Sequence, residues 1–160
     1  MSIWSKILGN RNKPISFKDD YFGELSHELK TDIYGKKTSS RNLKGKVLFD
    51  TVEVKVNLDC GTGGPNNSQK DFFTLLSSEF DIIKNKRIIP LLEAQLANWL
   101  DKKIVRIDYD TDIILREIII PDCLTNPIEW KLTMVYTPTD NFITIKFIDF
   151  IPDKKVTFDG

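Results

Sequence analysis

One glycine-rich stretch has the residue types of a phosphate-binding loop. GTGGPNNSQK (Gly61–Lys70) follows an alternating apolar segment and precedes a helix-like one. A Walker loop requires Lys and then Ser or Thr directly after its sixth residue, but here the sixth residue is Asn66, followed by another asparagine and a serine. The pattern G-x-G-x-x-G fails at the same position, and Pro65 removes a backbone donor. We interpret the stretch as a strand-to-helix turn in which Ser68 and Asp71 form the helix cap, with nucleotide or phosphate binding as the alternative.

Three aspartates alternate in the segment DYDTD, as they do at the opening of a calcium-binding loop. Such a loop has Gly at its sixth position and Glu at its twelfth. Counted from the first aspartate, Ile113 and Ile119 occupy those positions here. We therefore interpret Asp108, Asp110 and Asp112 as an acidic turn that precedes a strand.

The nucleophile-bearing side chains form no catalytic pattern. His27 is the single histidine, and the nucleophile motif G-x-S-x-G does not occur in the sequence. Cys60 and Cys123 are too few to supply the paired C-x-x-C ligands of a zinc site. Both cysteines lie beside strand-like segments, where structural thiols are common, and His27 suits a partly exposed strand position.

Carboxylates offer acid–base groups without a histidine, and Asp59, Glu129 and Asp149 are examples. Among 23 acidic residues, spacing alone does not single out a catalytic pair. We therefore expect a non-enzymatic protein with no catalytic residue, no cofactor and no metal site.

The composition is that of a folded domain without a charge bias. Hydrophobic residues make up 41% of the 160 residues, which is enough to form a core. The 23 basic residues balance the 23 acidic ones, whereas a dedicated nucleic-acid binder is usually basic. We expect one domain, residues 1–160, with no nucleic-acid partner.

The sequence predicts a soluble cytoplasmic protein with reduced cysteines. No segment approaches the roughly 18 apolar residues of a membrane span, and MSIWSKILGNRNK lacks the apolar region of a signal peptide. Within residues 1–14, however, Ile3, Trp4, Ile7 and Leu8 have helical spacing. They predict a short amphipathic segment, which is either a docking anchor or a terminal turn packed on the domain.

Two central segments have helical periodicity. In residues 68–84 the apolar residues recur at intervals of three and four: Phe72, Phe73, Leu76, Phe80 and Ile83. Residues 88–100 place Leu92, Leu96 and Trp99 on one face, with Pro90 near the start, where a missing N–H costs least. The segments are either two helices or one long helix kinked at Pro90.

Strand-like segments surround these helices on both sides of the sequence. They are residues 21–25, with Gly23 as a bulge, and residues 52–58, 113–120, 128–136, 142–150 and 155–158. The polar segment 30–45 reads as a loop or hairpin end, and TPTDN (137–141) as a hairpin turn. This order predicts an α+β domain, a mostly antiparallel sheet with two central helices packed on one face.

The strand around Trp130 predicts two different faces. Trp130, Leu132 and Met134 alternate with Glu129, Lys131 and Thr133, so that the apolar set faces the core. If helices leave the other face uncovered, it is a broad charged surface, which suits protein recognition better than a small-molecule pocket.

Several segments, taken together, resemble a family of known proteins. They are YFGEL, VEVKVNLD, GPNNSQKDFF, PIEW and VTFDG, together with the opening MSIWSKILGN. They resemble a group of small uncharacterised bacterial cytosolic proteins, which carry a domain of unknown function and are often encoded beside secreted polymorphic toxins. The resemblance implies an immunity-type role, in which the protein binds a cognate toxin and blocks it. None of the segments is a catalytic motif, so the resemblance transfers no functional residue.

An immunity-type role requires a surface that is complementary to the partner. Many toxins are basic nucleases, and acidic side chains can mimic phosphate, so we predict that Asp108, Asp110 and Asp112 bind the partner. Two alternatives remain. One is a structural or regulatory subunit, and the other is a small cytosolic enzyme or nucleotide binder that uses Gly61–Lys70.

Overall fold

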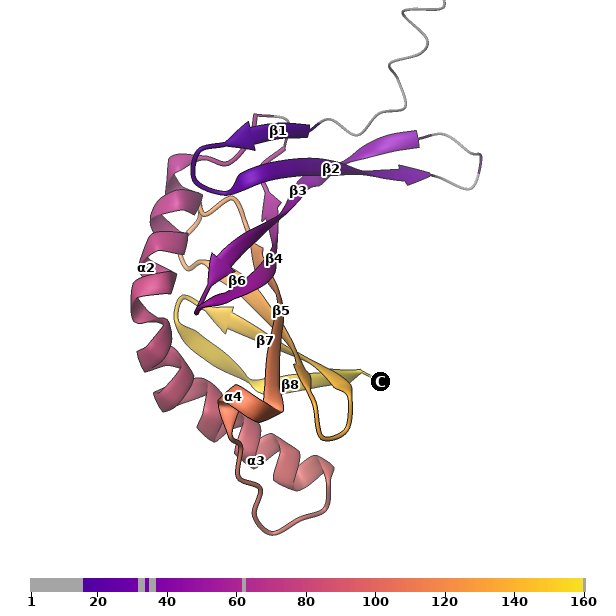
Figure 1. Ribbon diagram of the computed structural model, residues 1–160. Helices are drawn as coiled ribbons and strands as arrows, with labels where there is room; N and C mark the ends of the chain where they lie inside the picture. The colour runs from indigo at the N-terminus through magenta and orange to yellow at the C-terminus, as the bar shows by residue number, and fades with distance from the viewer. Residues whose placement is uncertain (1–15, 32–33, 35–36, 62, 160) are drawn as a thin grey trace, which may run out of the picture.

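The computed structural model describes residues 16–31, 34, 37–61 and 63–159. The amphipathic segment predicted within residues 1–14 lies outside the described residues. Eight strands form one sheet, and their order in the sheet is their order in the chain (Figure 1). They are β1 (Ser16–Asp19), β2 (Gly23–Thr31), β3 (Lys37–Phe49), β4 (Val52–Asp59), β5 (Ile113–Ile120), β6 (Glu129–Tyr136), β7 (Asn141–Ile148) and β8 (Ile151–Asp159).

The sheet consists of two antiparallel halves with a parallel joint between them. Strands β1 to β4 pair antiparallel in sequence order, and so do β5 to β8. Strands β4 and β5, at the centre, pair parallel. A parallel pair cannot be joined by a tight turn, so the chain must return along the sheet between them. The helices make this return on one face of the sheet, which confirms the predicted α+β class (Figure 1).

The return is one long helical path, as in the one-helix alternative of the sequence analysis, and the two separate helices of the fold prediction are not found among the described residues. Helix α2 (Asn67–Ile83) continues through a π-helical segment, η1 (Lys84–Ile88), into α3 (Ile89–Trp99). The N–H of Ile89 donates to the carbonyl of Lys84, five residues back. Pro90 stands at the start of α3, and the wider π turn before it lets the helix continue past a residue without an N–H. None of the described helices is long and apolar enough to cross a membrane.

The predicted helix cap is also corrected. Asn66, and not Ser68, is the N-cap of α2. Its side chain accepts from the N–H of Gln69 at 2.8 Å, and the Gln69 side chain accepts from the Asn66 N–H at 3.1 Å. This is a reciprocal capping box, with Gln69 in place of the predicted Asp71.

The core lies between the helical path and the facing side of the sheet. The predicted inward residues Trp130, Leu132 and Met134 are buried, and the Trp130 ring stacks on Phe147. Trp99, which the sequence analysis placed on the buried face of its helix, is instead 44% exposed and stacks on Phe158 of β8. Trp99 is the last residue of α3, where the helix has run past the broad part of the sheet.

The first third of the sheet differs from the sequence prediction. Tyr21 and Phe22 form the turn between β1 and β2, and Gly23 begins β2 with a φ of +72°, a conformation that favours glycine. Much of the predicted loop 30–45 belongs to β2 and β3, because pairing with neighbouring strands satisfies the backbone of a polar segment. His27 is 4% exposed and therefore buried, in contrast to the partly exposed position predicted for it.

The carboxyl ends of the two parallel strands are joined by one side chain. The side-chain amide nitrogen of Gln69 donates to the carbonyl of Asp59, the last residue of β4, at 3.1 Å, and to that of Pro121, which follows β5, at 2.7 Å. Gln69 is fully buried. Asn66 adds a bond of 2.8 Å to the carbonyl of Asp122. The first turn of α2 thus holds both strand ends of the parallel joint.

We predict that Gln69→Leu lowers the free energy of unfolding by roughly 2–4 kcal/mol, because two carbonyls lose their buried donor and the capping box is broken. Gln95→Leu is the matched control. The Gln95 amide donates to the carbonyl of Lys154 at 3.0 Å from a partly exposed position. Loss of this hydrogen bond should lower the free energy of unfolding by less than about 1 kcal/mol. Urea unfolding measures both values. Equal losses would show that Gln69 does not hold the joint.

Candidate functional site

The parallel joint is paired over only part of its length. Strands β4 and β5 are in register from Lys55 opposite Glu117 to Leu58 opposite Ile120. The first residues of each strand, Val52–Val54 and Ile113–Arg116, are not paired with each other in this part of the described chain. Figure 1 shows the tip of the β3–β4 hairpin diverging from β5. We call this divergence the β4–β5 fork.

Contacts with the helical path explain why the hairpin tip leaves β5. The Phe49 ring packs on Phe80 of α2, with 4.6 Å between centroids. In the next residue, the Asp50 carboxylate pairs with the Lys84 ammonium at 3.2 Å. Asp50 and Thr51 both have positive φ, 47° and 67°, as in the tight two-residue turns that connect hairpin strands. The hairpin tip therefore follows the helix layer, whereas β5 continues from the short helix α4 (Tyr109–Asp112).

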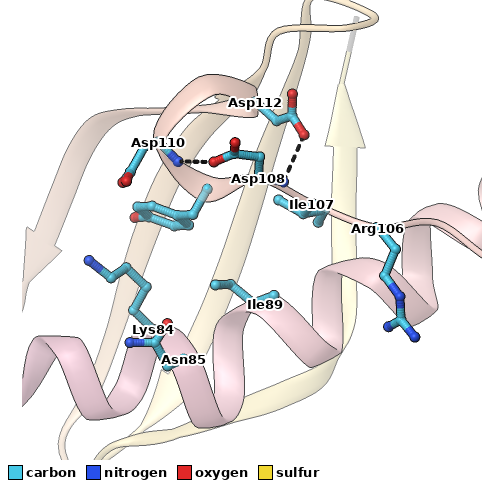
Figure 2. A pocket seen from close by; sticks show the side chains of 9 residues that line it. Lys84, Asn85, Ile89, Arg106, Ile107, Asp108, Asp110 and Asp112 are labelled. Carbon is cyan, nitrogen blue, oxygen red and sulfur yellow. Dashed lines mark hydrogen bonds between the residues drawn. The ribbon is translucent and has the colours of Figure 1, made fainter.

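Two neighbouring hollows open at the fork. The first, the fork hollow, has a volume of about 520 Å³ and lies between the hairpin turn and the start of β5; its lining includes Asp50, Glu53 and Arg116. The second, the helix hollow, has a volume of about 680 Å³ and lies between η1 and α4 (Figure 2). Tyr109 and Asp110 line both hollows, so α4 forms the wall between them.

Lys84 is the central cation of this region. Its ammonium lies 3.2 Å from the Asp50 carboxylate, 3.0 Å from that of Asp81, and 5.1 Å from the centroid of the Tyr109 ring. Burial alone would lower the pKa of Lys84, but the hydrogen bonds to Asp81 and Asp50 outweigh it and raise the pKa above its ordinary value. Lys84 is therefore fully charged, and its charge is already matched by two carboxylates.

Tyr109 carries a buried polar atom that has no partner. The side chain is 9% exposed, and its hydroxyl forms no hydrogen bond with any described residue. Burial, with the charges of Asp50 and Asp110, raises the pKa of this phenol far above its ordinary value, so it stays protonated. Leaving such a group unpaired costs about 1–3 kcal/mol. Tyr109 is therefore a buried side chain that lines both hollows and whose hydroxyl has no protein partner among the described residues.

The three predicted partner-binding aspartates come together on α4 in the form of an acidic turn. Asp108 caps the turn and accepts from the N–H of Asp110 at 3.3 Å, and Asp112 accepts from the N–H of Asp108 at 2.9 Å (Figure 2). The carboxylate of Asp110 has no ion-pair or hydrogen-bond partner among the described residues, and Asp110 is exposed. Asp110 is thus the member of the set that is available to a partner. The described residues contain no group of three side chains that could hold a metal ion.

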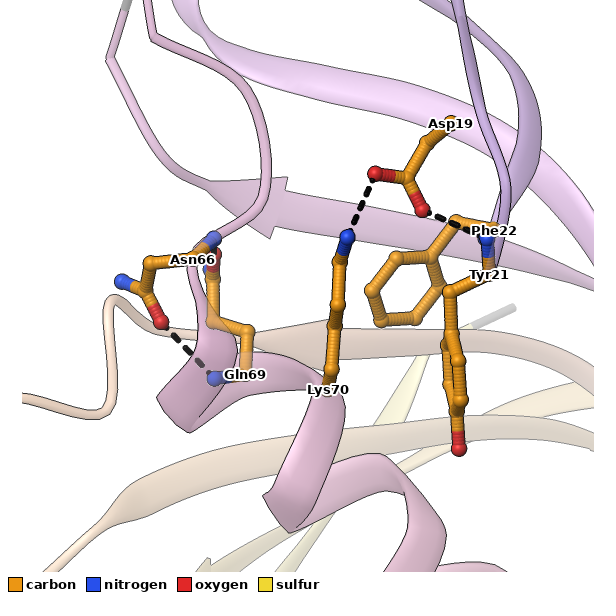
Figure 3. Close-up of polar contacts among 6 residues, drawn as sticks. All are labelled: Asp19, Tyr21, Phe22, Asn66, Gln69 and Lys70. Carbon is orange, nitrogen blue, oxygen red and sulfur yellow. Dashed lines mark hydrogen bonds and ion pairs between the residues drawn. The ribbon is translucent and has the colours of Figure 1, made fainter.

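The glycine-rich loop has its binding groups occupied by the protein itself. The first-turn N–H of Gln69 is bound by Asn66, and the Lys70 ammonium pairs with Asp19 at 2.9 Å (Figure 3). The Asp19 carboxylate also accepts from the N–H groups of Tyr21 and Phe22. This geometry favours the strand-to-helix turn over a phosphate cradle.

The other candidate residues have structural surroundings. Burial raises the pKa of Cys60 to about 11 and that of Cys123 to about 12, so both thiols are protonated near neutral pH. Asp149 accepts from the N–H of Ile128, and Glu129 pairs with Lys146 at 2.5 Å. Asp59 is exposed at the end of β4. No shared arrangement links these carboxylates to a reaction.

The face of the sheet opposite the helices carries an apolar strip. Ile114, Val135 and Phe142 are direct cross-strand partners on β5, β6 and β7, so they point to the same face. Ile114 and Phe142 are 43% and 48% exposed, whereas Val135 between them is buried yet stands outside the main core. Beside the strip lies a third hollow of about 420 Å³ that Phe142 and the fork residues Glu53 and Arg116 line.

Charged side chains surround this strip, in agreement with the outward positions predicted for the Trp130 strand. Lys46 pairs with Glu53 at 2.6 Å, and both are well exposed. Lys46 also stands directly opposite Lys55 on β4, and Lys131 directly opposite Lys146 on β7. Like charges in direct opposition do not stabilise a sheet, so folding stability does not account for these lysines.

Sequence reasoning missed Asp50, Lys84 and Tyr109. The acidic pattern of DYDTD drew attention to the aspartates, although the tyrosine between them is the buried residue. The tip of the hairpin, Asp50–Thr51, lacks the Asn-Gly or Asp-Gly signal of a tight turn. Lys84 ends the predicted helical segment 68–84, and no local pattern distinguishes it from the lysines exposed elsewhere.

Comparisons with models of known protein families, with curated proteins and with solved structures found no match to this chain. The resemblance to immunity-type proteins therefore stays a prediction.

We predict that Asp19→Asn lowers the free energy of unfolding at neutral pH and makes this free energy depend less on pH in the acid range. Burial alone would raise the pKa of Asp19, but the bonds from Lys70, Phe22 and Tyr21 outweigh it and lower the pKa below the ordinary 3.8. This stabilisation is complete above that value and is lost as the pH falls through the folded-state pKa. The free energy of unfolding at pH 7 should fall by about 1 kcal/mol relative to the native protein, and this difference should shrink near pH 3.

Asp20→Asn is the control, since Asp20 is the exposed neighbour of Asp19. It should behave like the native protein at both pH values. A constant difference between Asp19→Asn and the native protein across the pH range would contradict the proposed linkage.

Proposed function

We propose that this protein is a non-enzymatic protein-binding module of the bacterial cytoplasm, which acts as an immunity protein by neutralising a cognate toxin. The observation that carries the proposal is the uncovered sheet face, where Ile114, Val135 and Phe142 form an apolar strip among charged side chains. Protein interfaces have this anatomy, an apolar centre within a polar rim.

The arrangement of charges supports recognition of a macromolecule. The Lys46–Glu53 pair lies on β3 and β4, the Lys146–Glu129 pair lies farther along β7 and β6 than the strip, and both pairs are largely exposed. Exposed pairs of this kind add little to stability, but charged rims steer association and fix the orientation of a partner. The neighbouring hollows are open and mixed in polarity, whereas small-molecule pockets are enclosed and mostly apolar.

The resemblance of the sequence to immunity-type proteins suggests which kind of partner binds, namely a cognate toxin. An inhibitor of this class needs a rigid scaffold and a complementary surface, and a few anchor residues supply most of the affinity. A sheet covered by helices on one face leaves the other face free for such a surface. A structural or regulatory subunit would use the same face, but it would bind a housekeeping complex instead of a toxin.

We predict that the product of the adjacent gene kills cells when expressed alone, and that this protein both restores growth and copurifies with it in a stoichiometric complex. Growth assays and size-exclusion chromatography of the co-expressed pair measure the two outcomes. A harmless neighbour, or a toxic one that this protein does not neutralise, would contradict the immunity role.

We also predict that Phe142→Lys weakens binding of the cognate toxin at least tenfold, because it replaces the most exposed apolar side chain of the strip by a charge. Leu75→Lys on α2 is the matched control, because Leu75 is also 48% exposed but lies in the helix layer. Calorimetry measures the affinities and urea unfolding the stability of each variant. Equal weakening by both variants would move the interface away from the strip.

A further inference from the structure

The fork hollow is lined by charges of both signs, and one of its carboxylates has no partner among the described residues. The charged residues that line the fork hollow are three carboxylates and one guanidinium, namely Asp50, Glu53, Asp110 and Arg116. Asp50 is neutralised by Lys84, and Glu53 by Lys46. The Asp110 carboxylate has no such partner among the described residues. Arg116 lacks an ion-pair partner among these residues as well, so the unpaired charges of the hollow are one carboxylate and one guanidinium, and Asp110 is the group that a cationic side chain would bind.

Tyr109 provides a second and independent observation. It is the neighbour of Asp110 in the wall between the two hollows, is more than nine-tenths buried, and has a hydroxyl that bonds to none of the residues the structure describes. A neutral phenol can accept a hydrogen bond from a cationic donor. A guanidinium group carries five N–H donors in a fixed fork, so it can bind the Asp110 carboxylate and the Tyr109 hydroxyl together.

The backbone of the fork favours an extended partner segment. Phe49 and Val52 flank a two-residue turn and are direct partners, so they exchange backbone hydrogen bonds. Glu53, the next residue, therefore directs its N–H and C=O away from β3 and toward the fork. Strand β5 does not pair with this part of β4. Unpaired strand edges bind extended peptides through backbone hydrogen bonds.

We propose that the fork binds an arginine side chain on an extended segment of the protein partner, with Asp110 and Tyr109 holding the guanidinium and the Glu53 backbone pairing with the segment. The fork assignment rests on the proposed function, because it assumes that the partner is a protein. It specifies in addition that the recognised segment is extended and carries an arginine. The same segment can continue onto the apolar strip, because Glu53 and Arg116 line both the fork hollow and the hollow beside Phe142.

The test uses two synthetic peptides and the full-length protein. Both peptides are short, capped segments of alternating threonine and valine; one has a central arginine and the other has citrulline, which has the same shape without the charge. Each is titrated into isotope-labelled protein, and backbone amide shifts are followed by NMR. We expect the arginine peptide to shift the amides of Glu53, Asp110 and Arg116, and to bind at least tenfold more tightly than the citrulline peptide.

Three variants refine this test. Asp110→Asn should weaken binding of the arginine peptide at least tenfold, whereas Asp71→Asn, an exposed aspartate on α2, should leave it unchanged. Tyr109→Phe should weaken binding about threefold to tenfold and leave the unfolding midpoint equal or higher, because it removes a buried hydroxyl without a partner. Equal binding of the two peptides, or shifts that do not include the fork, would overturn the proposal.

The outcome separates this proposal from the proposed function. If the arginine peptide binds the fork but the adjacent gene product is neither toxic nor bound, the fork assignment stands and the immunity role fails. If that product is neutralised with the same affinity by the native protein and by Asp110→Asn, the immunity role stands and the fork assignment fails.

Discussion

The fold depends on the short parallel joint between β4 and β5. Each half of the sheet is an antiparallel meander in which neighbouring strands are also consecutive in the chain, and such pairs form locally. The joint brings together strands that are separated by the entire helical path, and it contains only four registered pairs. Gln69 compensates for this shortness, because one buried amide binds the carbonyls at the ends of both strands. The side chain that completes the capping box of α2 thus also holds the parallel joint together.

The same joint explains why the sheet opens at its other end. The helical path begins at the carboxyl ends of the parallel strands and descends along the sheet, so η1 arrives beside the β3–β4 turn. Phe80 and Lys84 then hold Phe49 and Asp50 against the helix layer. Strand β5 instead starts from α4, and the two strands meet only from Lys55 onward. The fork is therefore a consequence of how the crossover packs, and it requires no strained residue beyond the hairpin turn.

The sequence predicts individual helices and strands better than it predicts how they pack and pair with one another. Alternation identified β4 and the faces of β6, because each pattern is a property of a few adjacent residues, and helical periodicity identified the buried face of α2. Trp99 and His27 were misplaced because burial depends on where an element ends and on which strand covers it. The continuity of the helix past Pro90 depends on a π turn that no local pattern predicts. The fork was not predicted, since it arises from the register of strands about 60 residues apart in the chain.

The two faces of the sheet separate the residues that fix the fold from those of the proposed binding surface. Residues that face the helices are buried and fix the fold, so their identity is constrained by packing. Residues on the uncovered face are held in place by the same backbone, but their side chains contribute little to the core. Directly opposed lysines and an exposed phenylalanine are tolerated there because the rest of the molecule supplies the stability. A surface of this kind can change its partner by substitution while the scaffold is unchanged, which is what a family of specific inhibitors requires.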